Sequence, residues 1–154
     1  MAESITVAVE PWEGVDGAAL RAAQRAELDA RYGSDDHEPG EPPSADTVPI
    51  FLVARDAGGV AVGCGGLRPL TAGGAEIKRM YVRPESRGKG ASVAILQALE
   101  AAARGLGLAE LVLETGTAQP DAIRFYERNG YVPIPNFGPY IGEPMSLCYA
   151  RTLN

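Results

Sequence analysis

The order of apolar and polar positions along the chain predicts an antiparallel meander of strands in its first half. Residues 5–9 are a short β-branched run that ends before Pro11, which is typical of an edge strand. Apolar runs at 50–54 and 60–67 flank a glycine-containing turn and predict a β-hairpin. Residues 75–82 alternate between apolar and polar positions, as a further strand of the meander should.

The second half of the chain alternates between helical and strand patterns. In residues 91–104 the apolar side chains recur on one face at helical spacing. Residues 111–115 then predict a strand, so strand, helix and strand together form a right-handed βαβ unit. Pro120 suits the first position of another helix, for which Asn129 and Gly130 provide the end.

Four further segments complete the expected organisation. Residues 16–32 predict a helix before the meander. Residues 34–49 contain four prolines and five acidic residues, which predicts a loop with no more than a helical turn near Ser44. Two short strand patterns, at 131–134 and 145–150, end the chain.

Length and composition indicate an ordinary globular protein. With 154 residues the chain can bury one core, so residues 1–154 are expected to form a single domain. No apolar run is long enough to predict a membrane helix, and the first residues lack the pattern of a signal peptide. The two cysteines are far apart in the sequence, and we expect reduced thiols in a cytoplasmic protein without a metal site.

The charges are distributed unevenly along the chain. A net charge of −6 argues against a nucleic-acid partner, because phosphate backbones require a basic surface. Five acids lie within residues 33–47, whereas a basic cluster lies within residues 78–89: Lys78, Arg79, Arg83, Arg87 and Lys89. A local basic cluster in an acidic protein indicates a small anionic ligand.

The basic cluster ends in a turn that is suited to bind an anion. The segment Arg83-Pro-Glu-Ser-Arg-Gly-Lys-Gly90 joins the strand that ends at 82 to the helix that begins at 91. A helix N-terminus presents unpaired N–H groups and a positive dipole end, and glycines let the backbone approach a phosphate. Neither a P-loop nor a dinucleotide-binding fingerprint fits this segment.

Two segments resemble motifs of the GNAT superfamily of acetyltransferases. The run Arg87-Gly-Lys-Gly-Ala-Ser92 is similar to the acyl-CoA-binding motif [QR]-x-x-G-x-[GA], with Ser92 in place of the final small residue. The run from Gln119 to Tyr131 is similar to the segment N-x-x-A-x-x-[LF]-Y-[EK]-x-x-G-[FY], with Gln119 in place of asparagine. The resemblance covers roughly residues 48–150.

This resemblance implies a fold and a cofactor. The fold is mixed α/β and GNAT-like, with a mostly antiparallel twisted sheet of six to seven strands, a splayed parallel pair and about four helices. The co-substrate is acetyl-CoA, whose pyrophosphate binds the turn and whose pantetheine arm lies along the preceding strand. The residues expected to contact it are Met80, Tyr81, Val82, Arg87, Gly88, Lys89, Gly90, Ala91, Ser92 and Gln119.

The resemblance also implies catalytic residues. Tyr126 matches the family tyrosine that donates a proton to the departing thiolate of CoA. Glu76 begins a strand similar to that of the superfamily's histone acetyltransferases, in which a glutamate takes the proton of the amine. Glu114, on the neighbouring strand, is the competing base, and either carboxylate could instead pair with Lys78 or Arg79.

Three functions remain open from the sequence. The first is transfer of an acetyl group to the primary amine of a small molecule, by direct attack in a ternary complex. The alternatives are a protein or peptide amine as the acceptor, or an acyl-CoA sensor without catalysis. The oligomeric state does not follow from the sequence, which is compatible with a homodimer. Residues 33–47 either form a wall of the acceptor pocket or are an exposed connector.

Overall fold

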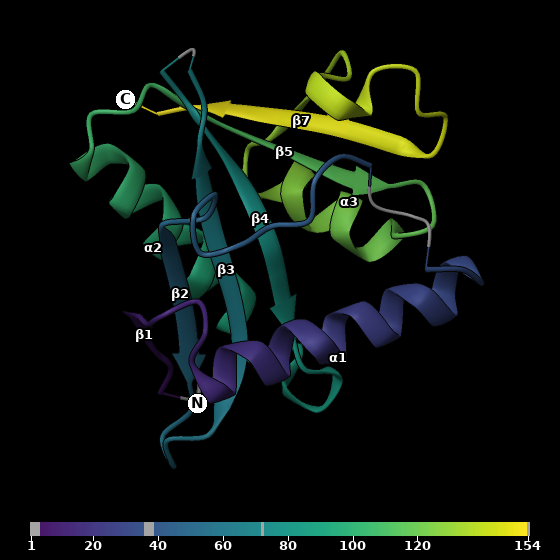
Figure 1. Cartoon of the computed structure of the whole chain (residues 1–154). Helices are drawn as coiled ribbons and strands as arrows, with labels where there is room; N and C mark the ends of the chain where they lie inside the picture. The colour runs from purple at the N-terminus through teal and green to yellow at the C-terminus, as the bar shows by residue number, and fades with distance from the viewer. Residues whose placement is uncertain (1–3, 36–38, 72, 154) are drawn as a thin grey trace.

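The chain folds around one mixed sheet, shown in Figure 1. The computed structural model describes residues 4–35, 39–71 and 73–153. Within these residues the sheet has the order β1-β2-β3-β4-β5-β7-β6, and β4 and β5 are its one parallel pair. The strands are Thr6–Val9 (β1), Ile50–Arg55 (β2), Ala61–Pro69 (β3), Ala75–Val82 (β4), Glu110–Gly116 (β5), Val132–Ile134 (β6) and Ser146–Thr152 (β7). This confirms the expected meander, with β1 at an edge.

Three α-helices occur in the described residues, α1 (Val15–Tyr32), α2 (Ala91–Gly105) and α3 (Pro120–Arg128). In Figure 1, α1 crosses the front of the sheet and α2 lies behind it. The expectation of about four helices was too high, because the remaining helical segments are single 3-10 turns, Pro84–Ser86 and Gly138–Tyr140. Near Ser44 the chain makes only a turn, because the neighbouring prolines lack the backbone N–H groups that a longer helix would need.

The parallel pair separates soon after it forms. Strands β4 and β5 are paired only at Ala75 with Leu111 and at Glu76 with Val112. Beyond these positions the two strands diverge towards their carboxyl ends, as Figure 1 shows. Helices α2 and α3 each begin shortly after one of the diverging strands, so their N-termini lie at the open end of the pair. The splayed pair expected from the resemblance is therefore present.

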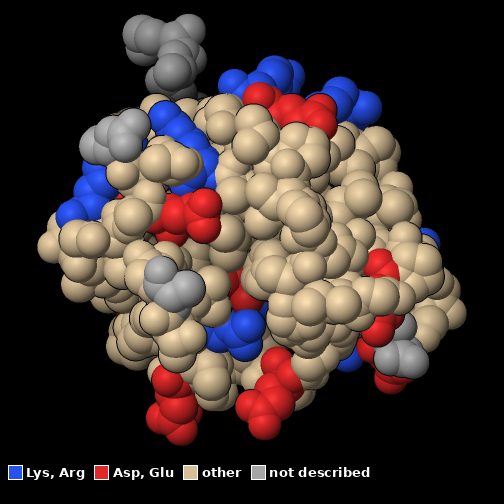
Figure 2. Space-filling model, turned by 90° about the horizontal axis from the view of Figure 1, so that it is seen from above, with Lys and Arg blue, Asp and Glu red and all other residues tan. Residues whose placement is uncertain are grey.

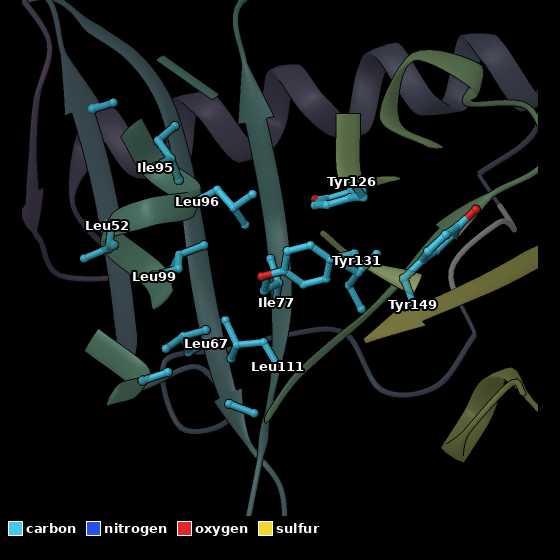
Figure 3. Close-up of a cluster of buried hydrophobic side chains, with 14 of the residues drawn as sticks. Leu52, Leu67, Ile77, Ile95, Leu96, Leu99, Leu111, Tyr126, Tyr131 and Tyr149 are labelled. Carbon is cyan, nitrogen blue, oxygen red and sulfur yellow. The ribbon is translucent and has the colours of Figure 1, made fainter. Parts of the chain in front are cut away.

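The main core lies between α2 and the sheet. Ile95, Leu96 and Leu99 of α2 are buried against the strands, as Figure 3 shows. Burial of each such side chain contributes about 1.5–3 kcal/mol. The helix packs closely because β3 has a glycine beneath it: a Cβ at Gly65 would lie 3.0 Å from Cγ2 of Ile95. This packing fixes the start of α2 at the open end of the splayed pair.

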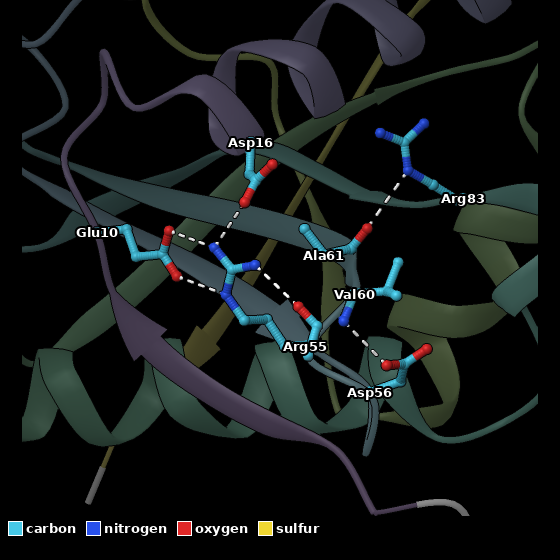
Figure 4. Close-up of polar contacts among 8 residues, drawn as sticks. Glu10, Asp16, Arg55, Asp56, Val60, Ala61 and Arg83 are labelled. Atoms are coloured by element: carbon cyan, nitrogen blue, oxygen red, sulfur yellow. Dashed lines mark hydrogen bonds and ion pairs between the residues drawn. The ribbon is translucent and has the colours of Figure 1, made fainter.

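Ionic contacts fix the start of α1 over the opposite face. Arg55 of β2 donates two hydrogen bonds to Glu10, at 2.9 and 3.1 Å, and one to Asp16 in the first turn of α1, at 2.9 Å (Figure 4). These bonds raise the pKa of Arg55. A second buried cluster, which includes Leu20 of α1 and Phe51 of β2, lies beneath the helix. The second half of α1 then extends across the open end of β4 and β5 (Figure 1).

Candidate active site

A bulge in β4 shapes the centre of the site. Cys64 pairs with Tyr81 and Gly66 pairs with Lys78, so Arg79 and Met80 together lie opposite the single residue Gly65. Arg79 has a φ of 58°, the only positive φ of a non-glycine residue among those that the structure describes. A bulge of this kind bends the strand and redirects its backbone groups. It lies where β4 has already separated from β5.

Side chains from two other elements hold the carbonyl groups of the bulge. The thiol of Cys64 donates a hydrogen bond to the Arg79 carbonyl at 3.2 Å, and Nε2 of Gln24 donates one to the Met80 carbonyl at 3.0 Å. Burial raises the pKa of Cys64 to about 12, so this sulfur stays a protonated donor. Gln24 belongs to α1, which therefore contacts the diverging strand directly. The bulge is a fixed part of the site.

The glycine-rich turn adopts a backbone conformation that only glycine accepts readily. Gly88 and Gly90 have φ values of 78° and 90°, and Gly90 is the N-cap of α2. In this structure a Cβ at either position would meet no atom within 4 Å. The positive φ, rather than a lack of space, is therefore what favours glycine at these two positions. Among the residues that the structure describes, no side chain caps α2 with a hydrogen bond, and its first N–H groups therefore remain suited to an anion.

A cavity of about 440 Å³ opens on this turn, and we call it the cofactor cavity. Every residue expected to contact acetyl-CoA lines it except Lys89, which is exposed and lies outside the lining. Arg87 donates hydrogen bonds to both carboxylate oxygens of Glu27 in α1, at 2.9 and 3.0 Å, and to the Val82 carbonyl at 3.0 Å. The turn is thereby connected to the helix on the other side of the cavity.

A second cavity, of about 420 Å³, lies beside the first, and we call it the acceptor cavity. Its walls come from α1, β4, β5, α3 and the residues before β7. Ser34 and Pro39, which belong to the acidic segment 33–47, also line it. Asp36, His37 and Glu38 of that segment lie outside the described residues.

Tyr126 lies where the two cavities meet. The residues that line both are Gln24, Leu28, Met80, Gln119, Ala122 and Tyr126. The ring of Tyr126 is 7% exposed and packs edge-on against Tyr131, with centroids 5.7 Å apart (Figure 3). Burial raises the pKa of the Tyr126 phenol, which keeps it protonated at neutral pH. A buried, protonated phenol thus borders both cavities.

The two candidate bases occupy different environments. Glu114 lines the acceptor cavity and accepts a hydrogen bond from Ser146 Oγ at 2.8 Å. Glu76 is fully buried and lines neither cavity. Its two oxygens accept hydrogen bonds from Arg68 at 2.7 Å and from Tyr140 at 2.6 Å. Of these two carboxylates, only Glu114 lines a cavity.

Sequence reasoning missed the residues that α1 and the C-terminal segment contribute. Gln24, Leu28 and Arg31 line the cavities at positions i, i+4 and i+7, so the helical period of α1 was the available signal. Tyr140 and Ser146 had no comparable signal, because only the folded chain brings them to Glu76 and Glu114.

The surface charges do not form one basic patch on the face that Figure 2 shows. Acidic and basic side chains lie there in small groups, including one of each sign in the hollow near its middle. Among the described residues, no helix is long and apolar enough to cross a membrane.

A splayed parallel pair, a glycine-rich turn at a helix N-terminus and two joined cavities define an acyl-CoA-dependent acyltransferase. Residues 18–131 match the acetyltransferase (GNAT) family, and the chain belongs to this family. It is an acetyl-CoA-dependent N-acetyltransferase.

Individual relatives agree with this assignment. The chain is 43% identical over 104 residues to an IAA acetyltransferase of Azospirillum brasilense, an alignment that covers 67% of each chain. It is 36% identical to a protein of Klebsiella pneumoniae described as an acyl-CoA N-acyltransferase, with a TM-score of 0.82 over 97% of this chain and 98% of that one. A GNAT acetyltransferase of Elizabethkingia anophelis, whose structure contains acetyl-CoA, shares the fold at 16% identity, with a TM-score of 0.71 and 97% and 98% of the two chains covered.

Proposed function

We propose that the protein transfers the acetyl group of acetyl-CoA to the primary amine of a small molecule, by direct attack in a ternary complex. The observation that carries this proposal is the junction of the two cavities at Met80 and Tyr126. Two cavities that meet at a proton donor can hold both reactants at once, and a volume of about 420 Å³ suits a small acceptor.

Each group at the junction has a role in this reaction. The amine nitrogen bonds to the acetyl carbon while the bond from that carbon to sulfur breaks. The carboxylate of Glu114 takes the proton that the amine loses, directly or through a water. The phenol of Tyr126 donates its proton to the departing sulfur, so protons and charges balance. Backbone N–H groups at the bulge near Met80 polarise the thioester carbonyl.

Glu76 has a positioning role in this proposal. Its hydrogen bonds to Arg68 and Tyr140 occupy both of its oxygens, and burial separates it from the acceptor cavity. It therefore holds the neighbouring cationic and phenolic side chains in place, while Glu114 acts as the base. Residues 33–47 contribute a wall of the acceptor cavity through Ser34 and Pro39.

The test is release of CoA from acetyl-CoA by the purified protein over a panel of primary amines and peptides. We expect turnover with small amines, and we expect Glu114→Gln to lower kcat about 100-fold. Glu110→Gln, an exposed carboxylate at the start of the same strand, is the matched control.

Other results would contradict the proposal in distinct ways. Turnover with peptides alone would assign a protein acceptor. Tight binding of acetyl-CoA without turnover of any amine would assign a sensor. A folded Glu76→Gln that loses more kcat than Glu114→Gln would assign the base to Glu76.

A further inference from the structure

One face of α3 lines the cofactor cavity and is turned away from the acceptor cavity. Of the α3 residues in the lining, Ala122 and Tyr126 border both cavities. Asp121, Phe125 and Arg128 line the cofactor cavity alone, at positions i, i+4 and i+7 of the helix. They lie about 100° around the helix axis from the first pair. Because the reacting end of acetyl-CoA belongs at the junction of the cavities, this face is available to the nucleotide end.

Arg128 differs from the other two arginines of this lining in its contacts. Arg87 and Arg31 share the carboxylate of Glu27, at 2.9 and 3.7 Å. Arg128 is exposed, and its side chain makes no hydrogen bond or ion pair with any residue that the structure describes. Asp121, on the same face of α3, is paired with Arg124. Arg128 can therefore pair with an anionic group without giving up an existing contact.

Apolar side chains lie in the same part of the lining. Phe125 is half-buried and precedes Arg128 by three positions, so the two are neighbours on the surface of α3. Val93, in the first turn of α2, also lines the cavity and is 37% exposed. Aromatic and aliphatic surfaces of this kind pack well against a flat base. Beyond the glycine-rich turn, the cavity thus offers an apolar surface and a cation, which complement an adenosine that carries a phosphate monoester.

A position near the end of a helix would by itself favour an arginine. Arg128 belongs to the last turn of α3, where a cation interacts favourably with the helix dipole. Arg104 has the same place in the last turn of α2 and is also exposed, but it lines neither cavity. Comparison of the two arginines can therefore separate an effect on the helix from an effect on a ligand.

We propose that Arg128 binds the 3′-phosphate of CoA and that Phe125 and Val93 pack against its adenine. The inference rests on the placement of acetyl-CoA in the cofactor cavity, which the proposed function assumes, but it does not depend on the acceptor. Its consequence concerns the acetyl donor. A phosphopantetheine arm on a carrier protein presents the same thioester without an adenosine 3′-phosphate, so the protein should select free acetyl-CoA over such a carrier.

The experiment compares three donors that differ only at the nucleotide end: acetyl-CoA, its 3′-dephospho form and S-acetyl-4′-phosphopantetheine. Calorimetry at low salt measures the Kd of each. We expect loss of the 3′-phosphate to raise Kd about 5- to 10-fold, because a charge-assisted hydrogen bond is lost. Loss of the whole adenosine should raise Kd further, since apolar contact is lost as well. The part of the preference that the 3′-phosphate provides should shrink at high salt.

Variants test the role of Arg128. Arg128→Gln should raise the Kd for acetyl-CoA about 5- to 10-fold and leave that for the dephospho form nearly unchanged, whereas Arg128→Lys should keep most of the preference. A general effect on α3 would weaken both donors equally and cancels when the two are compared. Arg104→Gln should change neither value. Phe125→Leu should weaken both nucleotide-containing donors about threefold without changing the affinity for the phosphopantetheine derivative.

The possible outcomes separate this inference from the proposed function. If the wild-type protein binds acetyl-CoA and its dephospho form equally well, or if a folded Arg128→Gln keeps the preference, the inference is wrong and the proposed function stands. Equal weakening of all three donors by Arg128→Gln would also overturn it. If the preference depends on Arg128 but no amine is acetylated, the inference stands and the proposed function fails. Thermal melts establish that each variant is folded.

Discussion

The two cavities of the site are built in different ways. The cofactor cavity takes much of its lining from one continuous stretch, residues 80–93, whose glycines and helix N-terminus present backbone groups. The acceptor cavity combines side chains from α1, β4, β5, α3 and the segment before β7. Backbone recognition needs only a local conformation, whereas recognition by charged side chains depends on how distant segments pack.

This difference indicates how the two halves respond to substitution. A change in the cofactor cavity should act mainly through backbone conformation and local charge, and should alter affinity for acetyl-CoA. A change in the acceptor cavity should act through a network of side chains, and should alter turnover or the choice of acceptor. Three substitutions, in order of decreasing effect, test whether the halves are separable in this way.

The largest effect is expected at the junction. Tyr126→Phe keeps the packed ring but removes the donor, so kcat should fall about 100- to 1,000-fold while affinity for acetyl-CoA changes little. Because burial raises the pKa of this phenol above its usual value of about 10, the wild-type rate should show no fall from its ionisation below about pH 10. Tyr149→Phe is the matched control, since Tyr149 is buried but lines neither cavity. Unchanged turnover in Tyr126→Phe would place the proton donor elsewhere.

An intermediate effect is expected in the turn. Gly90→Asp puts a side chain where φ is 90° and adds a negative charge beside the expected pyrophosphate. We expect the Kd for acetyl-CoA, measured by calorimetry, to rise about 50-fold. Gly107→Asp is the matched control, because Gly107 has a similar φ of 73°, lies beyond the other end of α2 and lines neither cavity. Equal affinities in these two variants would show that the turn does not bind the cofactor.

The smallest effect is expected across the mouth of the cofactor cavity. Glu27 pairs with Arg87 and places a negative charge in the cavity lining. Glu27→Gln should remove repulsion of the anion and make Arg87 available to it, so acetyl-CoA should bind about threefold more tightly at low salt. The gain should disappear at high salt. Asp29→Asn, on the same helix but outside the cavity lining, should give no gain, and weaker binding in Glu27→Gln would contradict the argument.

The sequence predicted the cofactor half of the molecule better than the acceptor half, for a physical reason. Strand periodicity, the helix start at Ala91 and the glycines at 88 and 90 are local signals, and each predicted element was found near its expected position. The environment of Glu76 was not predictable in the same way, because Tyr140 lies 64 positions away along the chain. A glutamate on a strand gives no sign of whether it will face a cavity or a buried arginine.

The bulge in β4 has a consequence for chain length. Ile77 and Val82 both belong to the core under α2, although residues five positions apart in a regular strand face opposite sides. Glu76 and Lys78 therefore point to the same side of the strand as Tyr81. The extra residue thus reverses the alternation midway along the strand. A one-residue deletion between 78 and 81 would keep the strand continuous but turn its first half over, so that both buried charges would enter the apolar layer. Chimaeras of this protein must therefore preserve the number of residues between 78 and 81, whereas the exposed turns of the meander should accept insertions.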